Sequence, residues 1–437
     1  MRILVVGSGG VGDAVARIAA GRGFFEVMVM ADHDLARAER TVAAARERDG
    51  SGQDRFLAAR VDASDAEAVA SLARRHGATH VLNAVDPRFV LPVFEGTFAA
   101  GADYLDMAMS LSRPHPTEPY ARPGLKLGDD QFAAAQRWKD AGRLALVGMG
   151  VEPGLSDVFA RYAADHLFSQ VDELGTRDGS NLVVLDDDGN PIFAPSFSIW
   201  TTIEECLNPP VIWEADRAGE PDGGWYTVPP FHEPEVFDFP GGIGPVECVH
   251  VEHEEVLLMP RFLDAKKVTF KYGLGEEFIS VLRTLHAVGL DRTDPVRVRS
   301  ADRDASGGPA TVAVSPRDVV AACLPDPASL GPRMRGATCA GVLVTGTGTD
   351  GSPREVYLHH VVDNAWSMAE YGAQCVVWQT AVNPVVALEL LADGRWSGSG
   401  VLGPEAFDAV PFLELLQADA PTGYGSPWGL QERPPGR

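Results

Sequence analysis

The stretch Arg2–Asp32, RILVVGSGGVGDAVARIAAGRGFFEVMVMAD, decides the fold. Residues 2–6 are a short run rich in β-branched side chains, which predicts a strand, and glycines follow directly. The apolar spacing of Val15, Ile18 and Ala19 then predicts a helix. A second apolar run at 26–31 predicts another strand. Strand, glycine turn, helix and strand in this order are typical of a dinucleotide-binding unit.

The glycine turn is the predicted phosphate site. In this unit Gly7 permits the tight turn, Gly9 lets a pyrophosphate approach the backbone, and Gly12 permits close helix packing. The positive end of the helix adds attraction for phosphate. We therefore expect the pyrophosphate to be held by Gly7, Ser8, Gly9, Gly10, Val11 and Gly12.

Asp32 bears on the choice of cofactor. It ends the second strand, twenty residues beyond Gly12, where an acidic side chain accepts hydrogen bonds from the adenosine ribose. A 2′-phosphate meets this carboxylate unfavourably, and no arginine directly follows it, so the sequence favours NAD. NADP is the alternative, with His33 as the nearest cation. The alternative to ribose binding is that Asp32 only caps the next helix.

Strands and helices continue to alternate as far as residue 107, which predicts an α/β fold with a parallel, doubly wound Rossmann sheet. Ligands of such sheets bind beyond the carboxyl ends of the strands. Asp62 is expected on the adenine side, and Asn83 and Ala84 on the nicotinamide side. Asp106 is the deepest candidate and a possible proton donor. Helix capping is the alternative role for either acid.

The pattern changes after this sheet. Four prolines in residues 110–130 predict an irregular crossover, and short strand-like runs from Leu182 onward predict an antiparallel sheet. Near the end of the chain, Asn383 and Pro384 suit the first positions of a helix that runs through Leu391.

Residues 250–255 hold the predicted acid/base group. A strand period of two places His250, Glu252 and Glu254 on one face, and His253 and Glu255 on the other. A metal is the alternative, but no third histidine stands nearby, and sheet rims are commonly charged. We expect no metal, with His253 and Glu254 as catalytic candidates beside Asp106.

Further residues are candidates for holding substrate. The segment GVEPGLSD at 150–157 places Glu152, Pro153 and Gly154 before a helix whose free N–H groups can bind a carboxylate; a plain helix start is the alternative. Arg261 or Lys271 is expected to clamp a substrate carboxylate. For Lys271 the alternative is packing of its stem.

Composition limits the partners. The chain has 437 residues, 45% hydrophobic and 22% charged, as in globular proteins, and its net charge is −24. Such a surface repels nucleic acids and anionic membranes, and attracts cationic amines. Five scattered cysteines without a CxxC pair indicate a reducing compartment. The start shows no signal-peptide pattern, so we expect a cytoplasmic protein without a membrane anchor.

Several longer strings together resemble the saccharopine dehydrogenase family, and within it the carboxynorspermidine dehydrogenase (carboxynorspermidine synthase) branch. They are GSGGVG at 7–12, NAVD at 83–86, ADYLDMA at 102–108, GVEPGLSD at 150–157 and DFPGGIGPVECVHVEHEE at 238–255. The resemblance implies an NAD(P)-dependent oxidoreductase acting on CH–NH groups. Such an enzyme condenses an amine or amino acid with a semialdehyde or keto acid to an imine and reduces it, or runs the reverse oxidation.

The resemblance also implies the domain organisation. We expect a dinucleotide-binding Rossmann domain at 1–128 and an α+β substrate-binding and dimerisation domain at 129–371. A C-terminal segment at 372–437 returns to the first domain, and the protein is a homodimer. The resemblance further implies that Asp363 holds the substrate amine.

Departures from the family pattern surround the expected substrate pocket. Asp32 and His33 replace a Ser-Arg pair, only Asp363 is kept of an Asp-His-Glu-Glu pattern, and Glu152 replaces an aspartate. The reaction class therefore follows from the resemblance, while the amine and the carbonyl stay open. Two alternatives also stay open: oxidative deamination of a lysine-type amine, and a catalytically inactive NAD-binding scaffold or sensor.

Overall fold

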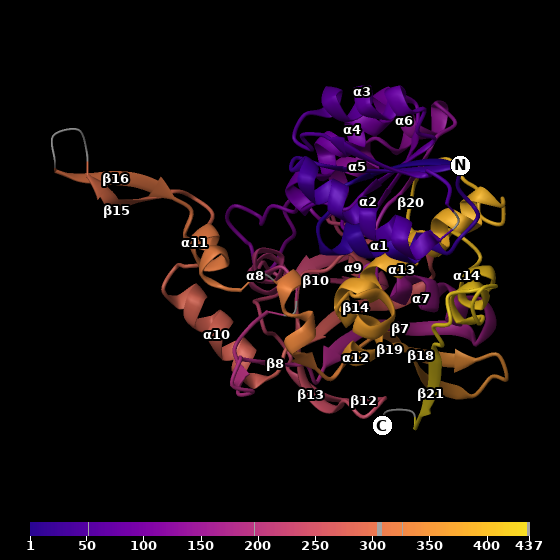
Figure 1. Ribbon diagram of the computed structural model, residues 1–437. Coiled ribbons are helices and arrows are strands. Elements are labelled where there is room, and N and C mark those ends of the chain that lie inside the picture. The colour runs from indigo at the N-terminus through magenta and orange to yellow at the C-terminus, as the bar shows by residue number, and fades with distance from the viewer. Residues whose placement is uncertain (51, 196, 304–307, 326, 435–437) are drawn as a thin grey trace.

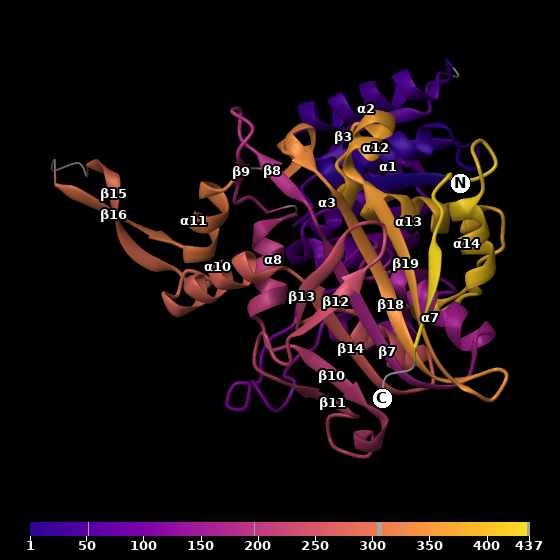
Figure 2. The ribbon, with the colours of Figure 1, turned by 90° about the horizontal axis from the view of Figure 1, so that it is seen from below.

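Two β-sheets organise the chain in the computed structural model, which describes residues 1–50, 52–195, 197–303, 308–325 and 327–434 (Figure 1). The N-terminal sheet and its helices lie at the top of Figure 1, and the larger second sheet lies below them. An arm projects from the second part, away from both sheets, in Figure 1 and in the view from below (Figure 2).

The first sheet has seven parallel strands in the order β20-β6-β5-β4-β1-β2-β3, which confirms the doubly wound α/β prediction. The strands are β1 (Arg2–Val6), β2 (Val27–Asp32), β3 (Phe56–Arg60), β4 (His80–Asn83), β5 (Asp103–Asp106), β6 (Leu144–Leu146) and β20 (Gly400–Leu402). The helices between them are α1 (Gly10–Ala20), α2 (Leu35–Asp49), α3 (Ala66–His76), η1 (Pro87–Phe89), α4 (Val90–Ala100), α5 (Asp129–Ala133) and α6 (Ala135–Asp140).

The second sheet is mixed and follows the order β11-β10-β14-β7-β18-β19-β21, with β13 and β12 branching from β14. Its strands are β7 (Phe168–Ser180), β10 (Val211–Glu214), β11 (Trp225–Thr227), β12 (Glu235–Phe239), β13 (Gly244–His250), β14 (Ala265–Gly273), β18 (Ala337–Gly348), β19 (Pro353–Asp363) and β21 (Gly429–Arg433). The prediction of an antiparallel sheet is wrong at one pair, because β14 runs parallel to β7. The long connection between these two strands returns the chain in the same direction.

The remaining elements cover this sheet or extend from it. Two small sheets are formed by β8 (Val183–Leu185), β9 (Pro191–Ile192) and β17 (Met334–Arg335), and by β15 (Val296–Arg303) and β16 (Pro309–Val314). The longer helices are α7 (Leu155–His166), α8 (Ile199–Leu207), α9 (Glu255–Phe262), α10 (Glu276–Ala287), α11 (Pro316–Cys323), α12 (Asn364–Tyr371), α13 (Cys375–Ala392) and α14 (Ala409–Gln417). The short helices are η2 (Ala215–Arg217), η3 (Pro327–Ser329), η4 (Gly331–Arg333) and η5 (Pro404–Ala406).

The sheets extend beyond the predicted domain limits. Strand β6 belongs to the first sheet, although the predicted boundary at residue 128 assigns it to the second domain. The C-terminal segment returns as expected, because β20 pairs with β6. Its last strand instead pairs with β19 in the second sheet, so the segment ties both sheets together.

Helix α13 corrects a second expectation. It is one continuous helix with Pro384 inside it, so the predicted helix start at Asn383 is wrong. Burial explains the continuity, because Val382 and Val385 are fully buried and the Asn383 side chain donates to the Gln379 carbonyl at 2.8 Å. The helix is long and apolar enough to span a membrane, but 78% of it is buried inside the protein, as in a core helix.

Candidate active site

The glycine turn has the close packing and open face that a pyrophosphate site needs. Gly7 has a φ of +108°, and a Cβ there lies 2.5 Å from the Ala84 carbonyl oxygen. A Cβ at Gly12 lies 2.0 Å from the Gly7 carbonyl oxygen, whereas one at Gly9 meets nothing within 4 Å. Gly9 begins α1 without a side-chain cap, which leaves N–H groups of the first turn for an anion. These residues fit a dinucleotide.

Asp32 ends β2 and lies beside this turn. It is 5% exposed, and its carboxylate accepts hydrogen bonds from the backbone N–H groups of Ser8 at 3.0 Å and Asp34 at 2.9 Å. Two basic side chains stand beside it, with Nδ1 of His33 at 3.0 Å and Nη1 of Arg37 at 3.6 Å. Helix α2 brings Arg37 there, a neighbour that the sequence order does not show.

A cavity of about 270 Å³ adjoins this carboxylate. It is lined by Val6, Gly7, Asp32, His33, Val61, Asp62, Ala63, Val85 and Phe89. The predicted adenine-side residue Asp62 is thus beside Asp32, and its own carboxylate accepts from Ser64. The pocket has the position expected for an adenosine.

A second cavity, of about 280 Å³, joins the glycine turn to the predicted acid/base residues. The first domain contributes Gly9, Gly10, Val11, Asn83, Ala84, Val85, Asp86, Pro87, Asp106, Met107 and Ala108. The rest of the chain contributes Val151, Glu152, Pro153, Asp178, Phe197, Ser198, Thr201, Glu205, His253, Glu254, Tyr272, Val376 and Thr380. The structure therefore brings Asp106, Glu152, His253 and Glu254 to one cavity.

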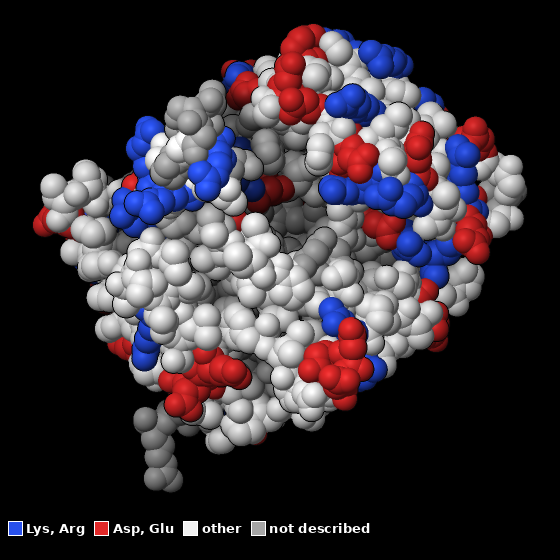
Figure 3. Space-filling view, turned by 60° about the vertical axis from the view of Figure 1, so that its left-hand side comes forward, with Lys and Arg blue, Asp and Glu red and all other residues white. Residues whose placement is uncertain are grey.

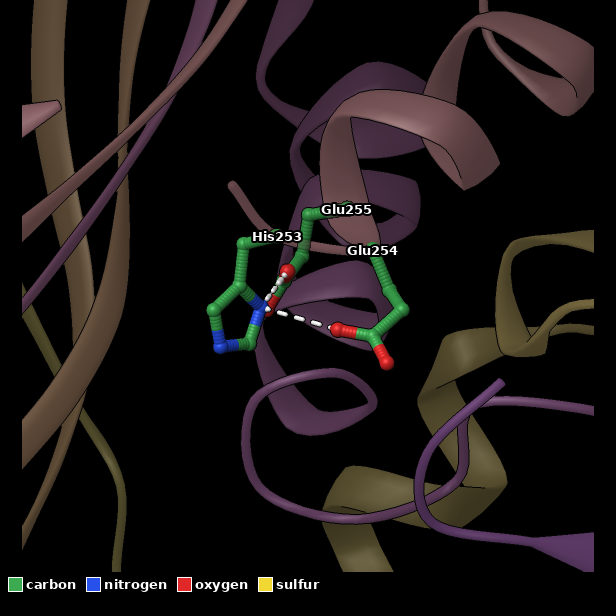
Figure 4. A group of neighbouring side chains, drawn as sticks. All are labelled: His253, Glu254 and Glu255. Atoms are coloured by element: carbon green, nitrogen blue, oxygen red, sulfur yellow. Dashed lines mark hydrogen bonds and ion pairs between the residues drawn. The ribbon is translucent and has the colours of Figure 1, made fainter. Parts of the chain in front are cut away.

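His253 lies at the start of α9 and not on a strand. Strand β13 ends at His250, and α9 begins at Glu255 because its next four residues are buried apolar side chains. The prediction of two strand faces through 250–255 is therefore wrong. His253, Glu254 and Glu255 instead converge, and His253 Nδ1 lies 2.5 Å from Glu255 Oε2 and 3.4 Å from Glu254 Oε2 (Figure 4).

The environment of His253 fixes both its orientation and its charge. Its ring stacks on Phe270 with 3.9 Å between centroids and 4° between planes. Burial lowers the pKa of His253, but Glu255, Glu254 and Glu205 outweigh burial and raise this pKa to about 10. The ring is therefore a cation near neutral pH. Its Nε2 points away from both neighbouring glutamates (Figure 4).

Glu152 and Glu255 are two fully buried carboxyl groups that interact with each other next to His253. Burial raises the pKa of Glu152 far above its ordinary value, and the hydrogen bond to Glu255 raises it further. Burial also opposes ionisation of Glu255, yet His253 brings the pKa of Glu255 below its ordinary value. Glu152 is thus the protonated partner and Glu255 the carboxylate. Ser156 Oγ donates to the other Glu152 oxygen at 2.5 Å.

Asp178 and Glu205 complete the cavity wall, and the sequence analysis missed both. Burial raises the pKa of Asp178 to about 7 and that of Glu205 to about 8. Asp178 lies on β7 and Glu205 on α8. Only for Glu205 does the sequence hold a signal of burial, because this acid is followed directly by Cys206 and Leu207, which are both buried.

Asp106 lies at the first-domain side of the cavity. Its carboxylate accepts from the Gly148 N–H at 2.7 Å and from Gln131 Nε2 at 2.8 Å, while burial raises its pKa to about 7. Glu254 accepts from the Met109 N–H at 3.1 Å, and its pKa is also raised by burial. The cavity thus holds several carboxyl groups that titrate near neutral pH, so that both their protonated and their ionised forms are populated there.

The same histidine and glutamates have the ligand types of a metal site. One ligand atom from each of His253, Glu254 and Glu255 lies within 4.8 Å of the others. The His253 Nδ1 atom, which a metal needs as its ligand, forms a hydrogen bond with Glu255. The ring therefore supplies the positive charge between the carboxylates. An acid/base role uses this arrangement directly.

Four predicted substrate residues lie outside the cavity lining. Arg261 stacks over Phe132 at 4.0 Å and donates to the Leu257 carbonyl. Lys271 is 7% exposed, and its Nζ lies 2.7 Å from Glu235. Asp363 caps α12 by accepting from the Trp366 N–H. Gly154 follows the lining residue Pro153, and its N–H donates to Asp157 at 2.7 Å.

Comparisons with known proteins agree with this geometry. The sequence profile of the saccharopine dehydrogenase NADP binding domain matches residues 3–146, and that of the saccharopine dehydrogenase C-terminal domain matches residues 150–420. The carboxynorspermidine synthase of Vibrio alginolyticus is 28% identical over 442 residues, covering 100% of this chain and 98% of the relative.

Two further proteins extend the comparison. The carboxyaminopropylagmatine dehydrogenase of Synechocystis sp. is 28% identical, covering 98% of this chain and 96% of the relative. Among solved structures, apo saccharopine dehydrogenase (L-Glu forming) from Saccharomyces cerevisiae superposes with a TM-score of 0.64 and 15% identity, covering 99% of this chain and 100% of that chain. This last likeness shows the shared fold.

Proposed function

The chain belongs to the saccharopine dehydrogenase family of NAD(P)-dependent oxidoreductases, and from that premise we propose that it condenses an amine with an aldehyde or keto acid and reduces the resulting imine. One observation carries the proposal: the glycine turn and the buried His253–Glu255 pair face a single cavity of about 280 Å³. The full-length relatives named for carboxynorspermidine and carboxyaminopropylagmatine chemistry support an amine substrate.

The cavity wall suits a cationic amine. Among the described residues that line it, six carry carboxyl groups and His253 is the one basic side chain. The carboxyl groups are Asp86, Asp106, Glu152, Asp178, Glu205 and Glu254. A protonated amine in the cavity stabilises the ionised form of one of these carboxyl groups. The resulting ion pair offsets the cost of burying either charge alone.

Asp178 and Glu205 are proposed to deprotonate this amine, since only a neutral amine attacks a carbonyl. A lysine-type ammonium has a pKa of about 10.4, so its proton moves to an ordinary carboxylate at a cost of about 8 kcal/mol. With carboxyl pKa values of about 7 and 8, that cost falls to roughly 3–5 kcal/mol. Burial of the two carboxyl groups thus roughly halves the free-energy cost of transferring the proton from the amine.

His253 is proposed to donate the proton that releases water. Attack of the amine on the carbonyl carbon gives a carbinolamine, and protonation of its hydroxyl lets water leave and the imine form. The imidazolium holds that proton, and Glu255 fixes the ring and stabilises its charge. The nicotinamide, when bound, supplies a hydride to the imine carbon. The apolar side chains and the protonated carboxyl groups of the cavity wall exclude water, which hydrolyses an imine.

For the cofactor we propose a preference for NADH, with Asp32 binding the ribose hydroxyls and Gly7 to Gly12 binding the pyrophosphate. His33 and Arg37 beside Asp32 support NADPH as the weaker cofactor. A homodimer in the cytoplasm remains part of the proposal.

The test follows the absorbance of the reduced nicotinamide with purified protein and pairs of amines and carbonyls. We expect consumption only when both substrates are present, and a secondary amine by mass spectrometry. Release of ammonia from an amine and oxidised cofactor identifies oxidative deamination instead. Tight NADH binding without turnover for any pair identifies a scaffold.

A further inference from the structure

Helix α8 carries Glu205, the proposed acceptor of the amine proton, into the cavity. Thr201 and Glu205 are one helical turn apart on this helix, and both line the cavity. Trp200 and Glu204 have the same spacing, so they share the adjacent, outer face of α8, and neither is among the described residues of the lining. The contacts of the outer face therefore set the rotation of the helix and the direction of Glu205.

Two guanidinium groups lie over the indole ring of Trp200. The Cζ atom of Arg88 is 4.5 Å from the ring centroid, and the Cζ atom of Arg317 is 4.8 Å from it. A cation is attracted to the negative face of an aromatic ring, and more strongly where water is excluded. Trp200 is only 8% exposed. The two arginines therefore hold the ring in place.

Arg317 holds the outer face of α8 at two positions. Besides lying over Trp200, it pairs with Glu204, and its Nε donates to the Asp291 carbonyl at 2.7 Å. Arg317 lies on α11, at the base of the arm that α10, β15, β16 and α11 form, and the surface of the molecule is hollowed beside this arm (Figures 1 and 3). The arm thus supports the cavity wall through α8, although none of its described residues lines the cavity.

Arg88 connects the same ring to the first domain. It lies on η1, and its Nε and Nη2 donate to the two carboxylate oxygens of Asp86 at 2.8 and 3.1 Å. Asp86 lines the cavity together with Asn83 and Ala84, on the predicted nicotinamide side. The contact between Arg88 and Trp200 therefore joins the coenzyme side of the cavity to the helix that carries the proposed amine acceptor.

We propose that Trp200, held by Arg88 and Arg317, is the positioning residue that directs Glu205 toward the amine. None of these three arginine and tryptophan side chains is among the described residues of the lining, so they act through α8 and do not touch the reacting atoms. The inference rests on the proposed function in one point, the assignment of the amine to Glu205.

The position of α8 also determines the pKa of Glu205. Burial raises this pKa to about 8; His253 opposes the rise, and Glu254, Glu255 and Asp178 add to it. A helix that rotates away from the cavity brings Glu205 into water and away from these carboxyl groups, so its pKa falls toward its ordinary value. The pKa of Glu205 therefore reports the position of α8 without any substrate.

Trp200→Leu is the first variant, because it keeps an apolar side chain and every charge but removes the ring beneath the two guanidinium groups. We expect the pKa of Glu205 to fall from about 8 to about 7 or lower. Infrared difference spectra across pH measure this pKa through the C=O band of the protonated carboxyl group, which is identified by its loss in Glu205→Gln. An unchanged pKa in Trp200→Leu overturns the proposal.

Kinetics test the same variant with substrates. We expect kcat/KM for the amine to fall at least about tenfold, because a reacting group displaced by about 1 Å can cost more than this. The dissociation constant for NADH is expected to stay within about twofold. Trp200→Tyr keeps an aromatic face for the two arginines and is expected to recover most of both losses, the one in pKa and the one in kcat/KM.

Arg283→Ala is the matched control, because Arg283 also belongs to the arm but lies 5.1 Å from the ring of Phe231, away from α8. We expect wild-type values in both measurements. Far-UV circular dichroism and NADH titration establish that each variant is folded. Equal losses in Arg283→Ala, or no recovery in Trp200→Tyr, overturn the proposal. A wild type that turns over no amine and carbonyl pair contradicts the proposed function instead, and the infrared comparison still decides the role of Trp200.

Discussion

His253 Nδ1 lies 2.5 Å from Glu255 Oε2, although the two residues are only two positions apart in the chain. The turn between β13 and α9 allows this contact, and the fully buried Glu255 carboxylate holds the imidazole as a cation against Phe270. The proposed proton donor is therefore already charged before substrate enters. Burial has the largest effect on the pKa of His253 and lowers it. Among the charged neighbours, Glu255 has the largest effect and raises this pKa.

Replacing Glu255 by glutamine is expected to lower the pKa of His253 toward its ordinary value of about 6.5. The imidazolium is then lost above neutral pH, so kcat/KM at pH 8 falls by up to about thirtyfold and its alkaline limb moves to lower pH. A pH profile of kcat/KM measures both effects. Glu252→Gln is the control, since Glu252 accepts from Ser112 and Asn208 and does not line the cavity. An unchanged alkaline limb in Glu255→Gln contradicts the assigned role.

Asp178→Asn and Glu205→Gln are expected to weaken the productive binding of amine. Each variant removes a group that accepts the proton of the amine, and the neutral amide cannot form an ion pair. We expect kcat/KM for the amine to fall about tenfold or more in each variant, while the dissociation constant for NADH stays within about twofold. Steady-state kinetics measures kcat/KM for the amine, and calorimetry measures the dissociation constant for NADH. Equal losses in amine turnover and NADH affinity would point to a distorted fold.

Replacing Asp32 by serine is expected to shift cofactor preference toward NADPH. The carboxylate that repels a 2′-phosphate disappears, while Arg37 and His33 remain beside the site. The ratio of the NADPH to NADH dissociation constants should fall at least about tenfold by calorimetric titration. Asp34→Ser serves as the control, because Asp34 caps α2 through the Ala36 N–H. Wild-type protein that already prefers NADPH contradicts the prediction.

Buried carboxyl groups with raised pKa values make stability fall as pH rises, and below about pH 6.5 they outnumber the buried histidines His80, His250 and His360, whose lowered pKa values act in the opposite direction. Asp106, Asp178 and Glu205 titrate near 7, 7 and 8 in the folded chain, above their ordinary values of 3.8 and 4.5. His253 titrates near 10, above 6.5. Between about pH 4.5 and 9 the folded state thus binds more protons than the unfolded state, and each titrating group lowers the free energy of unfolding by about 1.4 kcal/mol per pH unit.

Thermal melts across this range measure the effect. We expect the highest Tm near pH 5 and a continuous fall to pH 9. In Glu205→Gln the fall between pH 5 and 8 should be shallower, since one titrating group is gone. A Tm that rises from pH 5 to 8 contradicts the assigned protonation states.

The coenzyme half of the site could be predicted from the sequence because its signals are local. Gly7, Gly9, Gly12 and Asp32 lie within one βαβ unit, where spacing alone predicts that they meet at one end of the sheet. Arg37 was missed because its approach to Asp32 depends on where α2 begins.

The substrate half could not be predicted in the same way. Asp178 and Glu205 come from a long strand and from a helix that meet His253 only through the mixed sheet and its crossovers. Period-two reasoning failed at 250–255 because buried side chains at 256–259 start a helix there. The parallel pairing of β14 with β7 likewise depends on the path of a long connection, which no local pattern records.

The reductive condensation is tested most directly with NADH that carries deuterium at the transferable C4 position, with an amine and an aldehyde present together. We expect a secondary amine one mass unit heavier than with ordinary NADH, with deuterium on the carbon of the new C–N bond. Deuterium found in an alcohol derived from the aldehyde, or no transfer of deuterium with any amine and carbonyl pair, would contradict the reductive condensation.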